Sequence, residues 1–418
     1  MIRVEHLFKI FGEEPMRALP MLEEGKSKTQ IREETGLTVG VNDVSFELEA
    51  GEVFVIMGLS GSGKSTLLRC INRLIEPDAG KVLLTTDEGE IDVTALSLSE
   101  LRALRRDRMS MVFQQFGLFP HRTVLDNVAY GQEVRGAPRA DRLRVASEML
   151  DVVGLEGWGD SKPGQLSGGM QQRVGLARAL ATQANVLLMD EPFSALDPLI
   201  KVNMQDELLR IQDELHRTIL FITHDLDEAL RIGSRVAIMD DGVVVQIGTP
   251  EEIIVEPKTE YVADFVEHAD PTGVMTASTV AVPLPGDHFE DAGREGDTGY
   301  HHRVGNPSIT YGVRDGRFTG LRVDGEDVEA LRLEEALEME TPELRRGDVV
   351  LLCSPDATLR EVLKGRTYSR LPQVVVDEDD RVVGTISERE LIHGILYKRA
   401  SDDESGQTAG AAPASVGR

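Results

Sequence analysis

The sequence predicts an α/β fold with a largely parallel sheet for residues 1–266, followed by a smaller α+β domain. Apolar runs of strand length alternate with helical stretches up to about residue 265, the pattern of a parallel sheet with crossover helices. The chain has 418 residues, more than one hydrophobic core usually supports. From residue 270 the composition changes to Pro, Gly, Asp and Glu with weak periodicity, which is typical of a linker.

The strands of the first domain are expected where short apolar runs are bounded by polar or turn-forming residues. The clearest are Val53–Met57, Ser110–Phe113, Val186–Met189, Ile219–Thr223 and Val236–Met239. A polar insertion, residues 13–40, interrupts the pattern early. Its spaced apolar residues predict one or two short helices, which either contact a partner or cover the edge of the sheet.

The second part of the chain is expected to contain three regions. Residues 267–303 form a linker and an irregular start, residues 304–400 form the α+β domain, and residues 401–418 form a disordered tail. We expect strands at Ser308–Tyr311, Phe318–Val323, Gln373–Val376 and Val382–Ile386, and helices at Val328–Met339, Leu359–Leu363 and Glu388–Leu396.

A glycine-rich segment, residues 58–66, stands between the strand Val53–Met57 and a helical pattern. Its glycines let successive backbone N–H groups point at an anion, and the helix adds the positive end of its dipole. The expected nucleotide-binding residues are Gly58, Ser60, Gly61, Ser62, Gly63, Lys64, Ser65 and Thr66. Lys64 then reaches the β- and γ-phosphates and Ser65 offers its hydroxyl to Mg²⁺. The segment predicts binding of a nucleoside triphosphate.

A pair of carboxylates ends the strand that begins at Val186. Downstream of a phosphate-binding loop, this arrangement suits Asp190 to hold Mg²⁺ through water and Glu191 to polarise the attacking water. The sequence therefore predicts hydrolysis of the bound nucleotide, with Glu191 as its catalytic base.

A second anion cradle, Ser167-Gly168-Gly169, stands at the start of a helical pattern and carries no lysine. Bare glycine amides at a helix N-terminus can contact a phosphate that is bound elsewhere, for example across a dimer interface. Residues 166–180 resemble the signature motif of ATP-binding cassette (ABC) ATPases, with Met170 where many members have Gln. The resemblance implies a P-loop ABC-type nucleotide-binding domain with a helical subdomain.

Further motifs agree with this resemblance. Gln114 resembles the Q-loop glutamine that reaches Mg²⁺, and Asp197 lies in the equivalent of the D-loop. His224 resembles the switch histidine, held at the γ-phosphate by the strand before it. Phe11 resembles the aromatic residue that stacks on adenine, although Tyr is commoner there, so ordinary packing of Phe11 remains an alternative.

One complete set of these motifs is present in the sequence. Two composite ATP sites therefore require two chains, each contributing its phosphate loop to one ATP and its Ser167–Gly169 turn to the other. The expected assembly is an ATP-driven homodimer with ATP and Mg²⁺ as cofactors. A formal net charge of −27 argues against nucleic-acid binding.

The insertion and several runs in the first 265 residues resemble the ATPase subunit of glycine betaine/proline importers. This resemblance implies two copies of an integral-membrane permease as partners, with an extracellular substrate-binding protein acting indirectly. The chain has no run of 18 apolar residues and no signal-peptide layout at Met1. We therefore expect a peripheral protein on the cytoplasmic face of the membrane. The alternatives are an importer of choline or carnitine, or a non-transport ABC ATPase.

Those subunits append paired cystathionine-β-synthase-type (CBS) modules, and residues 384–390 resemble the second CBS repeat. In such repeats the positions of Ser387 and Glu390 often contact a ribose or phosphate. Around Gly320–Asp324 the first repeat is a poor match, because Val323 lacks a hydroxyl group. The region either binds an adenine nucleotide or serves as a packing or dimerising module, and the family resemblance implies regulation by ionic strength.

Acidic residues exceed basic ones in both parts of the chain, and the basic residues comprise 35 Arg and only 10 Lys. Dissolved salt screens repulsion between carboxylates, so a surface of this kind suits a salty cytoplasm. The composition favours a salt-accumulating halophile over an ordinary acidic protein.

Overall fold

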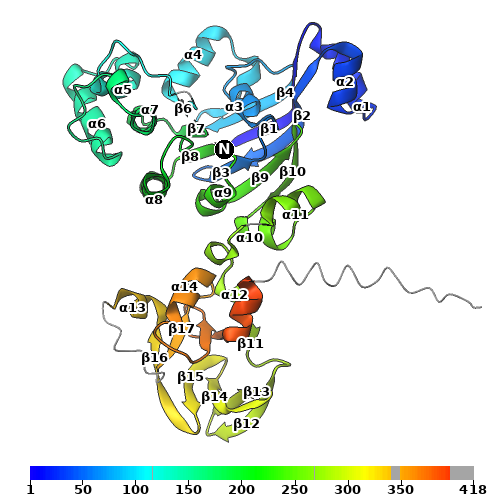
Figure 1. Cartoon of the computed structure of the whole chain (residues 1–418), viewed down its shortest axis with the longest axis vertical. Coiled ribbons are helices and arrows are strands. Elements are labelled where there is room, and N and C mark those ends of the chain that lie inside the picture. The colour runs from blue at the N-terminus through cyan, green and yellow to red at the C-terminus, as the bar shows by residue number, and fades with distance from the viewer. Residues whose placement is uncertain (115, 268, 340–348, 396–418) are drawn as a thin grey trace, which may run out of the picture. The chain divides into compact units, whose positions relative to one another are not determined.

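The computed structural model describes residues 1–114, 116–267, 269–339 and 349–395. It divides into two compact units, Met1–Val266 and Glu267–Arg418, which Figure 1 colours from blue to green and from yellow-green to red. The predicted tail, residues 401–418, lies outside the described residues. No helix in the described part of the chain is long and apolar enough to cross a membrane.

The first unit is organised around a six-stranded sheet, and all five strands predicted for this unit belong to it. Five of its strands are parallel and the outermost, β10, pairs antiparallel with β9. The sheet order is β10 (Val243–Gly248), β9 (Arg235–Asp240), β3 (Val53–Met57), β8 (Thr218–Thr223), β7 (Val186–Asp190) and β6 (Met109–Val112). The parallel strands share one carboxyl edge, where the loops after β3, β6, β7 and β8 begin.

Residues of the central strand β3 alternate between two hydrophobic cores. Val53, Val55 and Met57 belong to the core that includes α7 and α8, whereas Phe54 and Ile56 belong to the core on the opposite face. All five residues are buried, as expected for a parallel strand covered on both sides.

A four-stranded antiparallel sheet shares the second core. Its order is β2 (Thr38–Leu48), β1 (Ile2–Phe11), β4 (Ala79–Thr86) and β5 (Gly89–Asp92). The insertion leaves this sheet after β1 and returns at β2. It forms a 3₁₀ turn at Pro15–Ala18 and the helices α1 (Leu19–Glu23) and α2 (Lys28–Thr35), as predicted. Ala18, Ile31 and Leu37 are buried against Ile10 and Val39, so the insertion packs on strands β1 and β2.

The remaining helices of this unit surround the two sheets, and α5, α6 and α7 pack on one another as a helical layer (Figure 1). Their bounds are α3 (Lys64–Ile71), α4 (Leu98–Asp107), α5 (Val124–Val134), α6 (Arg139–Val152), α7 (Gly168–Ala181), α8 (Pro198–Leu215), α9 (Leu226–Ile232), α10 (Pro250–Val255) and α11 (Glu260–Val266). Ser167, Asp197 and Asp225 cap α7, α8 and α9 with a side-chain oxygen that accepts a backbone N–H, which is the preferred chemistry at this position.

The second unit is organised around one nine-stranded sheet. Its order is β11 (Val282–Pro283), β19 (Val382–Ile386), β18 (Gln373–Val376), β17 (Val349–Cys353), β16 (Glu326–Arg332), β15 (Arg317–Val323), β14 (Asn306–Arg314), β13 (Thr298–Arg303) and β12 (Phe289–Glu295). The helices are α12 (Ala277–Val280), α13 (Leu333–Glu338), α14 (Leu359–Gly365) and residues 388–395. The segments from β17 to residue 395 follow the order βαββα.

Two sequence-based expectations for this unit are wrong. Residues 267–303, expected as linker, contain the strands β11, β12 and β13. The helix expected at Val328–Met339 is the strand β16 followed by the short helix α13. Gly320–Asp324, where the sequence matches a first CBS repeat poorly, lies in an antiparallel run from β12 to β16. Strand β12 is almost wholly exposed, so pairing with β13 rather than an apolar pattern fixes it as a strand.

Candidate functional site

The phosphate loop follows β3 at the carboxyl edge of the sheet, where glycine is required at two positions. Gly58 has φ +153°, and a Cβ on it would lie 2.0 Å from the carbonyl oxygen of Met239. Gly63 has φ +102°, and a Cβ there would lie 2.2 Å from the carbonyl oxygen of Gly40. No L side chain fits either position, because the neighbouring atoms are backbone. The loop is thus held closely by two other segments.

Lys64 begins α3 and bends back over the loop. Its Nζ donates to the carbonyl oxygens of Gly58 and Leu59, both at 2.8 Å, and to Ser62 Oγ at 3.3 Å. The residue is only 5% exposed. Burial lowers the pKa of Lys64, while the charges of Glu191 and Asp190 oppose the shift. The ammonium group therefore lies against the carbonyl oxygens of Gly58 and Leu59 at the start of the loop.

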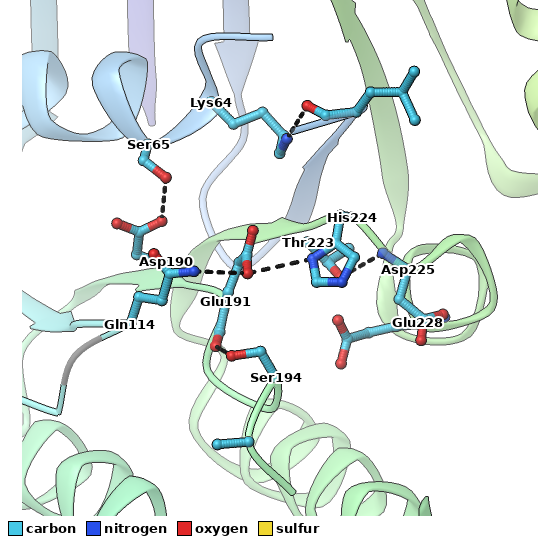
Figure 2. Close-up of polar contacts among 12 residues, drawn as sticks. Lys64, Ser65, Gln114, Asp190, Glu191, Ser194, Thr223, His224, Asp225 and Glu228 are labelled. Carbon is cyan, nitrogen blue, oxygen red and sulfur yellow. Dashed lines mark hydrogen bonds and ion pairs between the residues drawn. The ribbon is translucent and has the colours of Figure 1, made fainter. Parts of the chain in front are cut away.

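Asp190, the last residue of β7, is fully buried and held by two groups from α3. Ser65 Oγ donates to Asp190 Oδ1 at 2.7 Å, and Arg69 Nη2 donates to Oδ2 at 3.0 Å. Asp190 has no exposed surface. The hydroxyl and the carboxylate that the sequence assigned to Mg²⁺ therefore touch each other (Figure 2).

Glu191 lies at the centre of a polar cluster built from three strand ends. Its Oε2 accepts a hydrogen bond from Gln114 Nε2 at 3.0 Å and lies 3.3 Å from His224 Nδ1 (Figure 2). Its backbone has φ +50°, a left-handed conformation that is uncommon for a residue with a side chain. The Glu191 amide donates to the carbonyl of Ile222 at 3.0 Å. The structure thus brings together the three predicted catalytic residues, Gln114, Glu191 and His224.

Phe11 lies beside the start of α3. A Cβ on Gly40 would lie 2.8 Å from Cε2 of Phe11 and 3.3 Å from Cγ2 of Thr66. The absence of a side chain at Gly40 therefore lets the ring approach the phosphate loop. Phe11 is 40% exposed, and Lys9 Nζ lies 5.5 Å from its ring centre. An exposed aromatic ring at this position has a face available for stacking.

The second glycine turn, Ser167–Gly169, lies on the surface at the N-terminus of α7. The side chain of Ser167 accepts a hydrogen bond from the Met170 amide at 3.3 Å. Gly168 is exposed, and nothing lies within 4 Å of a Cβ built on it. Asp197 is also exposed and caps α8. Gly168 and Asp197 therefore face open space on this chain, whereas Gly169 lies close to Ala195 and Leu196.

Sequence reasoning missed Gln172, which is 1% exposed and joins α7 to the segment after β7. Its Nε2 donates to the carbonyl of Glu191 at 3.1 Å, and its Oε1 accepts from the Ala195 amide at 3.0 Å. The sequence offers only one clue, a polar residue on the apolar face of a helix.

A second missed group supports the loop that carries His224. Lys201 of α8 lies 2.6 Å from Asp225 Oδ2 and 3.4 Å from Glu228 Oε1. Gln205 donates to Glu228 at 3.2 Å. Burial raises the pKa of Glu228, which is 4% exposed. These contacts anchor α9, and through Asp225 they anchor the residue next to His224.

In the second unit, Ser387 and Glu390 are engaged by the chain itself. Arg303, at the end of β13, donates to both carboxylate oxygens of Glu390 at 2.6 and 2.8 Å and to Ser387 Oγ at 3.0 Å. The Glu390 side chain is 9% exposed. Although burial favours the neutral acid, the hydrogen bonds from Arg303 and Ser387 lower the pKa of Glu390 to about 2.

Comparison with known proteins agrees with this geometry. The ABC transporter family model matches residues 41–194, and the CBS domain model matches residues 347–397. The glycine betaine/carnitine transport ATP-binding protein GbuA of Listeria monocytogenes is 49% identical over 385 residues, which cover 92% of this chain and 95% of that protein. The chain belongs to the ABC transporter ATP-binding proteins.

Two further comparisons extend over different parts of this ABC ATPase. The glycine betaine/proline betaine transport ATP-binding protein ProV of Escherichia coli is 45% identical over 397 residues, 94% of this chain and 97% of that protein. The dimeric structure of the ATP-binding cassette MJ0796 bound to ADP and Pi covers 60% of this chain and 99% of that one, with 34% identity and a TM-score of 0.51. The predicted family and the predicted ATPase activity are confirmed.

Proposed function

We propose that this ABC ATPase powers the import of glycine betaine, proline betaine or a related quaternary-amine osmoprotectant through a partner permease. The observation that carries the proposal is the extent of the similarity to GbuA, which covers 92% of this chain and so extends through most of the C-terminal unit as well as the ATPase core. Because the name of that relative also includes carnitine, carnitine is the second candidate substrate.

Within the site, we assign the nucleotide to the phosphate loop and its surroundings. Lys64 and the amides of residues 60–66 hold the phosphates, and Phe11 stacks on adenine. Glu191 accepts a proton from the attacking water, while Gln114 and His224 orient that water and the γ-phosphate. The contacts of Glu191 with Gln114 and His224 support this division of roles.

The residues assigned to Mg²⁺ fit a hard cation. Asp190 and Ser65 present a carboxylate and a hydroxyl 2.7 Å apart, and Gln114 adds an amide oxygen nearby. Mg²⁺ is usually held by one or two protein ligands together with water and phosphate oxygens, and when bound it neutralises charge that develops on the phosphates. Arg69 bonds to the second oxygen of Asp190, so Oδ1 and the Ser65 hydroxyl are the groups that would be offered to the cation.

We assign a homodimer in which Ser167, Gly168, Gly169 and Asp197 of one chain close the ATP site of the other. The exposure of Gly168 and Asp197 supports this assembly, as does the dimeric state of the similar cassette MJ0796. The dimer binds two copies of the permease on the cytoplasmic face of the membrane, and an extracellular binding protein delivers the solute. The acidic surface suits a halophile.

The experiment is reconstitution of the chain with its permease and binding protein in vesicles loaded with ATP. Uptake of labelled glycine betaine is compared with that of carnitine, choline and a neutral amino acid. We expect ATP-dependent uptake of a quaternary amine that is lost with Glu191→Gln. Vesicles that hydrolyse ATP but accumulate none of the quaternary amines would contradict the proposal.

A further inference from the structure

The insertion reaches the phosphate loop through the turn that joins β9 to β10. This turn consists of Asp241 and Gly242, with φ +41° and +83°, the two-residue form that suits an Asp-Gly hairpin. The Gly242 amide donates to the carbonyl of Ser62 at 2.9 Å, and its carbonyl accepts from the Asn42 amide at 2.8 Å. The turn is therefore bonded directly to the middle of the phosphate loop.

Close backbone contacts complete this arrangement. Strand β9 and the end of the insertion contact the two ends of the loop. The Met239 carbonyl lies close to Gly58, and the Gly40 carbonyl lies close to Gly63. The Gly40 carbonyl also lies 3.1 Å from the position of a Cβ on Gly242. Any displacement of the turn is transmitted to the loop, since little space separates them.

Lys28 connects the insertion to this turn. It is the first residue of α2, whose capping box is formed by Ser27 and Gln30. Its side chain is 15% exposed, and its Nζ lies 3.3 Å from Asp241 Oδ1 and 2.4 Å from the position of a Cβ on Gly242. The helix that carries it is anchored by Ile31, which has no exposed surface. Lys28 is thus a largely covered cation that lies against this two-residue turn, whose Asp241 side chain is 69% exposed.

We propose that Lys28 is a positioning residue for ATP binding, which holds the Asp241–Gly242 turn and through it the backbone of the phosphate loop. The inference rests on the proposed assignment of residues 58–66 to the nucleotide. A loop that must turn its amides toward a bound phosphate loses conformational entropy on binding. A contact that orders the loop before the nucleotide binds reduces this entropic cost. Loss of Lys28 should therefore weaken ATP binding without slowing the chemical step.

The test uses Lys28→Met in the full chain, which keeps most of the aliphatic stem and removes the charge. Lys26→Met is the matched control, because Lys26 lies in the same insertion and pairs with exposed Glu34 at 2.6 Å. For Lys28→Met we expect the Kd of a fluorescent ATP analogue and the KM for ATP to rise about fivefold to tenfold, with kcat within about twofold of wild type. Amides 58–64 should exchange hydrogen faster without nucleotide. Lys26→Met should match the wild type.

Variants of Asp241 provide a second route. Asp241→Ala should reproduce the loss of affinity, and the double variant with Lys28→Met should be no weaker than either single one. Asp241→Asn keeps an acceptor oxygen and should stay close to the wild type. The inference would be overturned if Lys28→Met left both the affinity for ATP and the hydrogen exchange of amides 58–64 unchanged. If Lys28→Met does not fold, the same result in Asp241→Ala would overturn it. Unchanged ATP affinity in Lys64→Ala would instead overturn the assignment of the phosphate loop.

Discussion

The side-chain amide of Gln172 bridges α7 and the segment that carries Glu191, donating to the Glu191 carbonyl at 3.1 Å and accepting from the Ala195 amide at 3.0 Å. Because α7 begins at the exposed Ser167–Gly169 turn, this one buried side chain links two parts of the proposed machinery. One part serves the ATP of the same chain, and the other is assigned to the ATP of the partner chain.

Replacement of Gln172 by Leu should reduce turnover more than binding. The change removes two hydrogen bonds, each worth about 0.5–1.5 kcal/mol. The Ala195 amide loses its Gln172 partner, whereas the Glu191 carbonyl keeps the amide and hydroxyl of Ser194. We expect kcat to fall about tenfold, while the KM for ATP changes less than twofold. Gln171→Leu is the control, since the Gln171 side chain donates to the carbonyl of Leu166, just before α7, and that bond does not involve the Glu191 segment. Equal losses in both variants would argue against a specific role for Gln172.

Replacement of Glu191 by Gln should nearly abolish hydrolysis while ATP remains bound. A general base contributes about 10²–10⁴-fold, and an amide keeps the shape of the side chain without its basicity. Single-turnover hydrolysis and ATP retention after gel filtration measure the two effects. The preparation should accumulate as a dimer with ATP, and near-normal turnover would exclude Glu191 as the base.

The Arg303–Glu390 pair predicts a dependence of stability on pH in the second unit. The pKa of Glu390 is about 2 in the folded protein against an ordinary 4.5, so the pair stabilises the fold above pH 4.5 and loses this effect as the pH falls toward 2. Glu390→Gln should therefore be less stable than the wild type at pH 7, and the difference should shrink between pH 4.5 and pH 3. Urea unfolding followed through this range is the measurement. A constant difference would mean that the carboxylate charge contributes nothing.

The same pair bears on whether the CBS region binds an adenine nucleotide. Since Arg303 already occupies both oxygens of Glu390 and the hydroxyl of Ser387, we expect no adenosine ligand there. Calorimetry should give one ATP per chain for the wild type and no AMP or ATP binding for Lys64→Ala. Nucleotide binding by Lys64→Ala that is lost in Glu390→Gln would reveal a second site.

Ionic strength should act on the second unit through its charges. Arg322 pairs with Glu295 and Asp327, and Arg332 pairs with Asp380, all partly exposed. Salt screens exposed pairs and the general acidic repulsion. The unfolding midpoint should rise between low and molar KCl.

A chain ending at Val266, the limit of the first compact unit, should keep ATPase activity with its permease but lose most of the dependence of that activity on salt. Full salt activation of this shorter chain would exclude the second unit as the sensor.

The sequence by itself determined the ATPase fold and its chemistry. Strands β3, β7 and β8 are wholly buried, so their apolar runs stand out, and the phosphate loop must follow β3 because glycine geometry and helix dipole act locally. Lys64 and Glu191 could therefore be predicted as site residues from their neighbours in the chain.

Only the tertiary structure decided which distant groups meet. Gln172, Lys28 and Arg303 each act on residues far away in sequence, and a polar side chain carries no periodic pattern that reveals its partner. Strand β12 was missed for a different reason. Its partner β13 is adjacent in the sequence, but the exposed residues of β12 are ordered by hydrogen bonds to β13 and show no apolar face. Local propensity predicts elements that bury an apolar face of their own. Contacts between separate segments of the chain can be identified only in the folded structure, which brings both partners together.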